Sequence, residues 1–140
     1  MATTLSLKSL LSPSKTVEVD YPGFTNFKVN LAFLSRETLI NIRKKATKNV
    51  FKNRAAQEEL DDKLFLKLYV DAAVKGWKGL KLSYLEQLAP IDMTGQDPNT
   101  EMEYDQDNAL YLMQASSNFD AFVSETVTEL SNFTKSNTSS

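Results

Sequence analysis

The chain has 140 residues, no cysteine and no histidine, and a formal net charge of −2. The lack of cysteine excludes disulfides and thiolate chemistry, and the lack of histidine removes the commonest general base and zinc ligand. No run of about 18 apolar residues could span a membrane, and the first residues do not resemble a secretory signal. We therefore expect a single soluble domain that is not an enzyme.

The charge is distributed unevenly along the chain. Residues 1–56 contain ten Lys or Arg and three Asp or Glu, a net charge of +7, whereas residues 57–140 contain six and fifteen, a net charge of −9. Two interpretations stay open: the halves neutralise each other within the fold, or one of them binds a charged partner.

The N-terminal part predicts a β-hairpin. Residues 1–14 are rich in Ser, Thr and Leu and predict a flexible segment. Apolar and polar residues then alternate over residues 15–20 and 27–33, on either side of the turn Tyr21-Pro22-Gly23. An isolated hairpin is only marginally stable, so its apolar face must pack on helices or on another chain.

The rest of the chain predicts helices. The spacing of apolar residues indicates helices over residues 36–48, 59–77, 83–89, from 105 onward and 118–133. Residues 49–56 and 94–100 are predicted loops, and residues 134–140 a disordered tail. The expected fold is mainly α (α+β): one domain over residues 15–133, with a small N-terminal β-hairpin followed by a compact bundle of four to five helices.

The sequence contains no recognised catalytic or ligand-binding motif. Its four glycines do not form a phosphate-binding loop. Acidic residues gather between Asp97 and Asp107, but an EF-hand loop starting at Glu101 would need Gly and Glu where Gln106 and Leu112 stand. We therefore expect no catalytic residue, no cofactor and no metal.

Residues 43–54 contain six positive side chains and no acid. Three interpretations stay open: a solvated helix end facing the acidic half, a docking surface for an acidic protein, or phosphate contacts with nucleic acid or lipid. Phe51 is the only aromatic residue there, which argues against base stacking. The candidate partner-binding residues on the hairpin face, the basic helix and the last helix are Phe27, Val29, Leu31, Phe33, Arg36, Arg43, Lys44, Lys45, Phe122, Leu130 and Phe133.

Several short segments follow one another in an informative order. In chain order they are Phe33-Leu34-Ser35-Arg36, Ile42-Arg43-Lys44-Lys45-Ala46, Glu59-Leu60-Asp61, Trp77-Lys78-Gly79-Leu80, Tyr84-Leu85, Tyr104, Asn108-Ala109-Leu110, Leu112-Met113 and Phe119-Asp120. No single segment is diagnostic. Their serial order resembles that of the tail assembly chaperones of long-tailed, siphovirus-like bacteriophages, over about residues 15–133.

This resemblance implies a role in phage tail assembly. Such chaperones act late in infection in the host cytoplasm, coat the tape measure protein, help to recruit major tail tube subunits, and are expected to be absent from the mature virion. Many are also made in a longer, frameshifted form, which would be a further partner, and association of identical copies stays open. The alternatives are a structural minor tail or connector protein of the virion, and a small regulator that binds nucleic acid, although nucleic acid and membranes are not expected partners.

Overall fold

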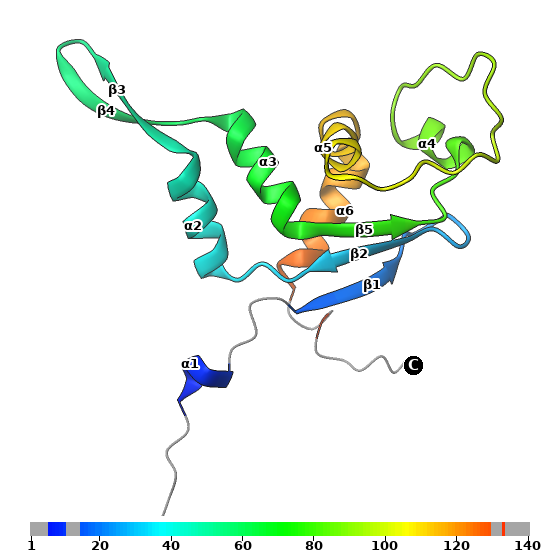
Figure 1. Ribbon diagram of the computed structural model, residues 1–140, viewed down its shortest axis with the longest axis horizontal. Coiled ribbons are helices and arrows are strands. Elements are labelled where there is room, and N and C mark those ends of the chain that lie inside the picture. The colour runs from blue at the N-terminus through cyan, green and yellow to red at the C-terminus, as the bar shows by residue number, and fades with distance from the viewer. Residues whose placement is uncertain (1–5, 11–14, 130–132, 134–140) are drawn as a thin grey trace, which may run out of the picture.

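The computed structural model describes residues 6–10, 15–129 and 133, and Figure 1 shows its elements. Within these residues it contains two antiparallel sheets and six helices, the first being the single turn α1 (Leu7–Leu10). The predicted flexible segment, residues 1–14, lies largely outside the described residues, and the predicted disordered tail, residues 134–140, lies entirely outside them.

A three-stranded sheet organises the body of the protein. Its strands β1 (Thr16–Asp20), β2 (Lys28–Ala32) and β5 (Val74–Lys78) lie in the order β1-β2-β5, and both pairs are antiparallel. The predicted hairpin is confirmed as β1 and β2, with Val19 opposite Val29. On the opposite face of this hairpin, Lys28 forms an ion pair with Asp20, so one face of the sheet is apolar and the other polar.

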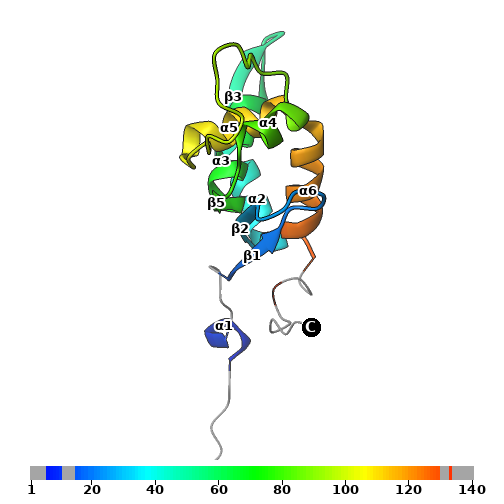
Figure 2. The same ribbon diagram turned by 90° about the vertical axis from the view of Figure 1, so that its right-hand side faces the viewer.

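Three helices cover the apolar face of the sheet: α3 (Asp62–Ala73), α5 (Gln106–Ala115) and α6 (Ser117–Val127), as Figures 1 and 2 show. The side chains of Asp61, Asp105 and Ser116 cap their N-termini by accepting hydrogen bonds from backbone N–H groups three residues later. A shorter helix, α4 (Leu82–Leu88), follows β5. The predicted helices over 83–89 and from 105 correspond to α4 and α5.

The core lies between the sheet and these helices. Val29 and Leu31 of β2, Val74 of β5 and Phe119 of α6 are completely buried. Trp77 and Phe119 meet edge to face, with ring centroids 6.3 Å apart. Burying each such side chain contributes about 1.5–3 kcal/mol, so the sheet face is a main source of stability.

Residues 28–78 form one long hairpin. The chain leaves the sheet along β2, continues through α2 (Arg36–Ala46) and β3 (Thr47–Lys52), turns, and returns through β4 (Ala55–Leu60), α3 and β5. The two halves are antiparallel in both sheets, and a hydrogen bond from the Asp61 N–H to the Ala46 carbonyl, 2.8 Å long, joins them between the helices and the outer strands. The turn of this hairpin lies far from the body (Figure 1).

The predicted helical bundle is therefore wrong, because the structure contains five strands in two sheets among its described residues. The predicted helix over 59–77 begins at Asp62 and ends at Ala73, and Val74–Lys78 forms a strand. The apolar spacing of Val70, Ala73, Val74 and Trp77 suits a helix equally well, but pairing with β2 buries Val74 completely. Tertiary burial overrides the local pattern here.

The predicted loop over residues 49–56 is also wrong. This segment lies within the β3–β4 hairpin, in which Thr47 pairs with Leu60 and Lys52 with Ala55. The predicted helix over 36–48 consequently ends at Ala46. The predicted helix over 118–133 corresponds to α6, which ends at Val127, and residues 130–132 of that prediction lie outside the described residues. The connecting turn is Asn53-Arg54, and both residues adopt positive φ angles, 53° and 65°. Two residues with positive φ in a two-residue loop are typical of the type I′ turn, which is favoured in β-hairpins.

Gly79, which follows β5, lies very close to the backbone of the β1–β2 turn. Its φ is +78°, and an added Cβ would lie 1.9 Å from the carbonyl oxygen of Asn26. Gly95 has a similar φ of +73° but nothing within 4 Å of such a Cβ. We expect Gly95→Ala to cost about 1–2 kcal/mol from the backbone conformation alone. Gly79→Ala should cost at least about 2 kcal/mol more, because the backbone of Asn26 must move.

Urea unfolding of the two variants and the wild type measures this difference. Equal losses of unfolding free energy in the two variants would contradict the close approach of Gly79 to Asn26.

Candidate interaction surfaces

Helix α2 presents a cationic face to solvent. Ser35 caps it by accepting a hydrogen bond from the Thr38 N–H, and Glu37 lies in its first turn, where an acid is favourable. Ile42 and Ala46 are buried, and α2 packs on α3. Arg43, Lys44 and Lys45 in the last turn are exposed, and so is the apolar side chain of Ile40, at 44%. Because cations stabilise a helix C-terminus, the same residues both stabilise the end of the helix and charge its surface.

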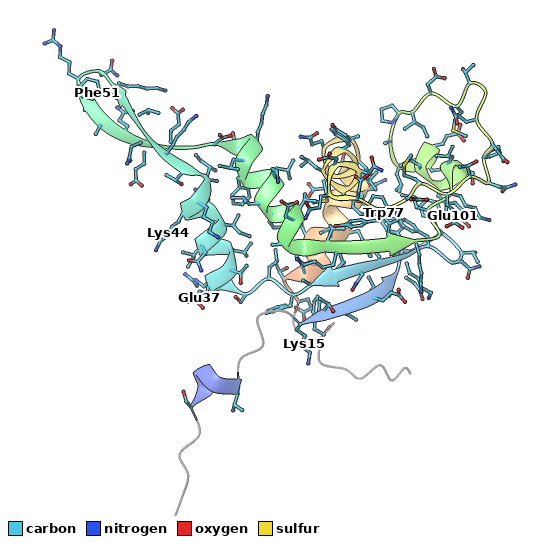
Figure 3. The ribbon with its side chains drawn as sticks, in the orientation of Figure 1. Lys15, Glu37, Lys44, Phe51, Trp77 and Glu101 are labelled. Carbon is cyan, nitrogen blue, oxygen red and sulfur yellow. The ribbon has the colours of Figure 1, made fainter. Side chains whose placement is uncertain are left out.

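The β3–β4 hairpin, which we call the arm, extends from the C-terminal end of α2 and the N-terminal end of α3 (Figure 3). All of its residues from Phe51 to Glu58 are exposed. The ring of Phe51, near the tip, is 75% exposed, a high value for a large apolar side chain. An ion pair of 2.6 Å between Lys52 and Glu59 joins the two strands, and it lowers the pKa of Glu59 through the hydrogen bond and the nearby charge.

Few of the cations on α2 and the arm are neutralised. Among the described residues, Lys52 is the only one of these side chains that forms an ion pair. That pair is also the only one that joins a cation of residues 1–56 to an acid of residues 57–140. The described ion pairs thus give little support to the interpretation that the oppositely charged halves neutralise each other.

An acidic loop lies at the other end of the molecule. Residues 89–107 contain six Asp or Glu and no Lys or Arg. The carboxylate of Asp92 accepts a hydrogen bond from Thr94 N–H and that of Asp97 from Asn99 N–H, which fixes two turns of the loop. The hydrogen bonds from Thr94 lower the pKa of Asp92. Within the described part of the chain, none of the six carboxylates forms an ion pair.

An apolar cavity of about 170 Å³ lies beneath this loop. Its walls come from β5, the end of α4, the loop and α5, and most of their side chains are apolar. Tyr111 lines it and is 63% exposed, so the cavity opens to solvent beside this ring. The residues that line the cavity are Trp77, Leu80, Leu85, Ala89, Ile91, Met102, Asn108, Tyr111, Leu112 and Ala115.

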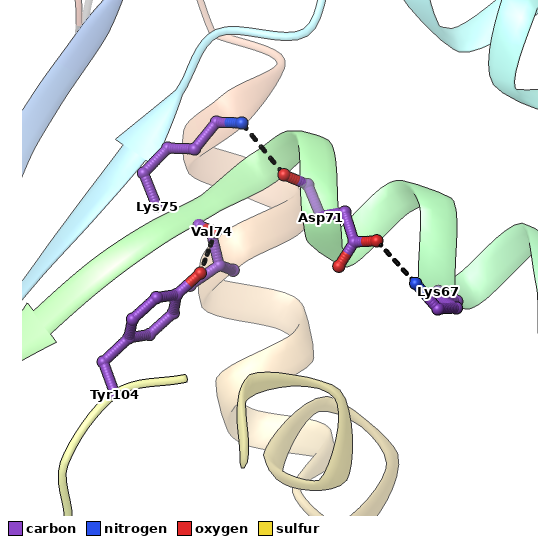
Figure 4. Close-up of polar contacts among 5 residues, drawn as sticks. All are labelled: Lys67, Asp71, Val74, Lys75 and Tyr104. Atoms are coloured by element: carbon purple, nitrogen blue, oxygen red, sulfur yellow. Dashed lines mark hydrogen bonds and ion pairs between the residues drawn. The ribbon is translucent and has the colours of Figure 1, made fainter. Parts of the chain in front are cut away.

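Two aromatic side chains fasten the acidic loop to β5. The indole N–H of Trp77 donates to the Met102 carbonyl, 2.8 Å away, and the Tyr104 hydroxyl donates to the Val74 carbonyl, 3.0 Å away. Figure 4 shows the second bond beside Asp71, which accepts from Lys67 and Lys75. Burial raises the pKa of Tyr104, and the carboxylates of Asp71 and Asp105 raise it further. The wall of the cavity is therefore held by hydrogen bonds to the sheet.

The raised pKa of Tyr104 predicts how its contribution changes with pH. Tyr104→Phe should reduce the free energy of unfolding by about 1 kcal/mol at pH 7, because the bond to the Val74 carbonyl is lost. In the wild type the folded state holds the phenol proton more tightly than the unfolded state does, so this stability is lost as pH rises beyond about 10. The difference between wild type and variant should therefore narrow above pH 10.

Urea unfolding between pH 7 and 11 measures this difference. Tyr111→Phe, which alters an exposed ring in α5, serves as the control and should change stability little at pH 7. A wild-type advantage over Tyr104→Phe that stays constant through pH 11 would contradict the assigned role of burial.

The candidate residues selected from the sequence fall into two groups. Phe27, Val29 and Leu31 are completely buried in the chain's own core, and Phe133 is also buried, with its ring 5.5 Å from that of Phe33. Phe122 is half-buried and its ring lies 4.6 Å from that of Tyr21. In contrast, Arg36, Arg43, Lys44 and Lys45 are exposed, whereas Leu130 lies outside the described residues. Partner contact by any of them stays a prediction.

Neither the arm nor the cavity was predicted from the sequence. The one available signal for the arm was Asn53, a residue that tolerates a left-handed conformation, between two segments of equal length. The cavity depends on long-range contacts between Trp77, Met102 and Tyr111, for which the sequence contains no local pattern.

Among the described residues, no three or more Asp, Glu, His or Cys side chains are grouped so that they could hold a metal ion. No helix in this part of the chain has the length and apolar character needed to cross a membrane.

A family model described as YdaY prophage protein matches residues 27–140, which include the whole long hairpin, the acidic loop and the last helices. No curated protein and no solved structure matches the chain.

Proposed function

We propose that the chain, which belongs to the YdaY prophage protein family and is therefore phage-derived, is a tail assembly chaperone. In this role it binds the tape measure protein in the host cytoplasm, helps to recruit major tail tube subunits, and leaves before the tail is complete. The family gives the phage origin, and the serial resemblance of segments such as Ile42-Arg43-Lys44-Lys45-Ala46 supports the finer role. The proposed function requires binding alone and no catalytic centre.

The observation that carries this proposal is the exposed cationic surface of α2. Arg43, Lys44 and Lys45 lie in its last turn without an ion pair to any described residue, and the apolar Ile40 is exposed on the same helix. A mixed cationic and apolar surface suits a protein that holds a long helical client. Many copies along one client need only modest affinity each, because avidity supplies the rest.

Co-expression with the tape measure protein of the same prophage tests the proposal. We expect the chain to increase the soluble fraction of the tape measure protein several-fold. The double variant Arg43→Glu/Lys44→Glu should lose most of this effect, because it reverses charge on the proposed client surface. Circular dichroism should show that the variant remains folded, since both side chains are exposed.

A matched control carries the same change in net charge elsewhere. Lys15→Glu/Lys63→Glu replaces two exposed lysines outside α2 and should retain the solubilising effect. If wild-type protein leaves the tape measure protein insoluble, the proposed function is wrong. If both double variants lose the effect equally, the client surface has been placed incorrectly.

The strand content favours a second candidate, a structural minor tail or connector protein. Virion proteins are commonly rich in strands, and this chain contains two antiparallel sheets where a helical bundle was predicted. Mass spectrometry of purified virions separates the two functions. The chaperone should be absent from mature particles, whereas a constant number of copies per particle would favour the structural role.

A further inference from the structure

The arm is a sheet without a partner in the described chain. It has only two strands, so the outer edges of both β3 and β4 are unpaired. A two-stranded hairpin is marginally stable alone, and open edges together with an exposed aromatic ring promote association. Phe51, 75% exposed, is the largest apolar side chain on the arm. These features indicate that the arm tip is a docking element.

The same chain offers a cavity that fits such a ring. The cavity beneath the acidic loop measures about 170 Å³ and is lined mainly by apolar side chains. An apolar cavity of about 150 Å³ is large enough to bind benzene. The ring of a phenylalanine therefore fits the available space, and Tyr111 at the opening could pack against it.

The charges around the two surfaces are complementary. Lys48, Lys52 and Arg54 lie within three residues of Phe51 on the arm. Glu101 and Glu103 flank the cavity residue Met102, and Asp107 precedes the cavity residue Asn108. Lys78 and Lys81 follow the cavity residues Trp77 and Leu80, so acids outnumber cations beside the cavity. None of these three carboxylates forms an ion pair within the described chain, and of the three cations on the arm only Lys52 does so, with Glu59. An apolar contact surrounded by opposite charges gives both affinity and a defined orientation.

The arm cannot fill the cavity of its own molecule. Figure 3 shows Phe51 at one end of the protein, while Trp77 and Glu101 mark the cavity and the loop at the other. The donor and the acceptor surfaces are also different, so the contact is heterologous, and copies that add head-to-tail each leave one free arm and one free cavity. The arm of a second copy of the chain is therefore the occupant that fits the cavity.

We propose that the arm tip of one copy docks in the cavity of the next, with Phe51 inserted and the basic residues of the arm facing the acidic loop. The result is an open, head-to-tail oligomer whose length depends on concentration. This proposal does not depend on the function proposed above, because it requires no phage client.

Sedimentation velocity of the purified full chain tests the proposal. Wild-type protein should form a series of oligomers that grows with concentration and shortens in 0.5 M salt, since salt screens the charges around the contact. Phe51→Ser should be monomeric because it removes the inserted ring. Ala115→Arg should also be monomeric, because it places a cation in the wall of the cavity and repels the arm. Both positions are exposed, so folding should be retained.

Mixing the two variants gives the most specific result. Phe51→Ser retains an intact cavity and Ala115→Arg an intact arm, so an equimolar mixture should form dimers and nothing longer. Leu10→Ser, which removes an exposed apolar side chain outside the arm and the cavity, is the matched control and should associate as the wild type does.

Three results would overturn the proposal. They are a wild type that stays monomeric at every concentration, Ala115→Arg oligomers that persist and so indicate arm-to-arm pairing, and a variant mixture that remains monomeric. If the wild type is monomeric and instead retards duplex DNA in a salt-sensitive gel-shift assay, the arm binds nucleic acid and the proposed self-association is wrong.

Discussion

The antiparallel pairing of β5 with β2 is the interaction on which the rest of the structure depends. It converts a marginal two-strand hairpin into a three-stranded sheet, and it buries Val29, Leu31 and Val74 beneath α3, α5 and α6. Without β5, the sheet would be a two-stranded hairpin, which is only marginally stable in water. The pairing also fixes Trp77, whose indole N–H holds the acidic loop through the Met102 carbonyl.

The same pairing explains why the molecule has an arm. Since β2 and β5 are neighbours in the sheet, the 41 residues between them must leave and return. They do so as paired helices and then paired strands, up to the turn at Asn53-Arg54. The basic residues of α2 and the arm are thereby carried to one end, while the acidic loop remains at the other (Figure 1). The charge asymmetry of the sequence thus becomes a separation in space.

The sequence predicted the elements whose signals are local. The alternation around Val17 and Val29 identified the first two strands, and apolar spacing located α4, α5 and much of α6. The sequence predicted the wrong element where one pattern suits both a helix and a strand. Val74 and Trp77 continue the helical spacing of α3 but lie in a strand. The segment Ala55–Leu60 is rich in helix-forming residues but also pairs as a strand. Arg54 also stands where a glycine usually marks this turn.

Of the candidate partner-binding residues, the exposed cations of α2 could be identified from charge alone. The cavity could not be identified, because its walls meet only in the folded chain.

Nuclear magnetic resonance of the full chain tests the β2–β5 pairing most directly. The structure predicts cross-strand Overhauser effects between the backbones of Val29 and Trp77 in the sheet and between those of Asn49 and Glu58 in the arm. The helical contacts of α3 should stop at Ala73. Uninterrupted helical contacts from Asp62 through Trp77, with no contact between Val29 and Trp77, would contradict the account.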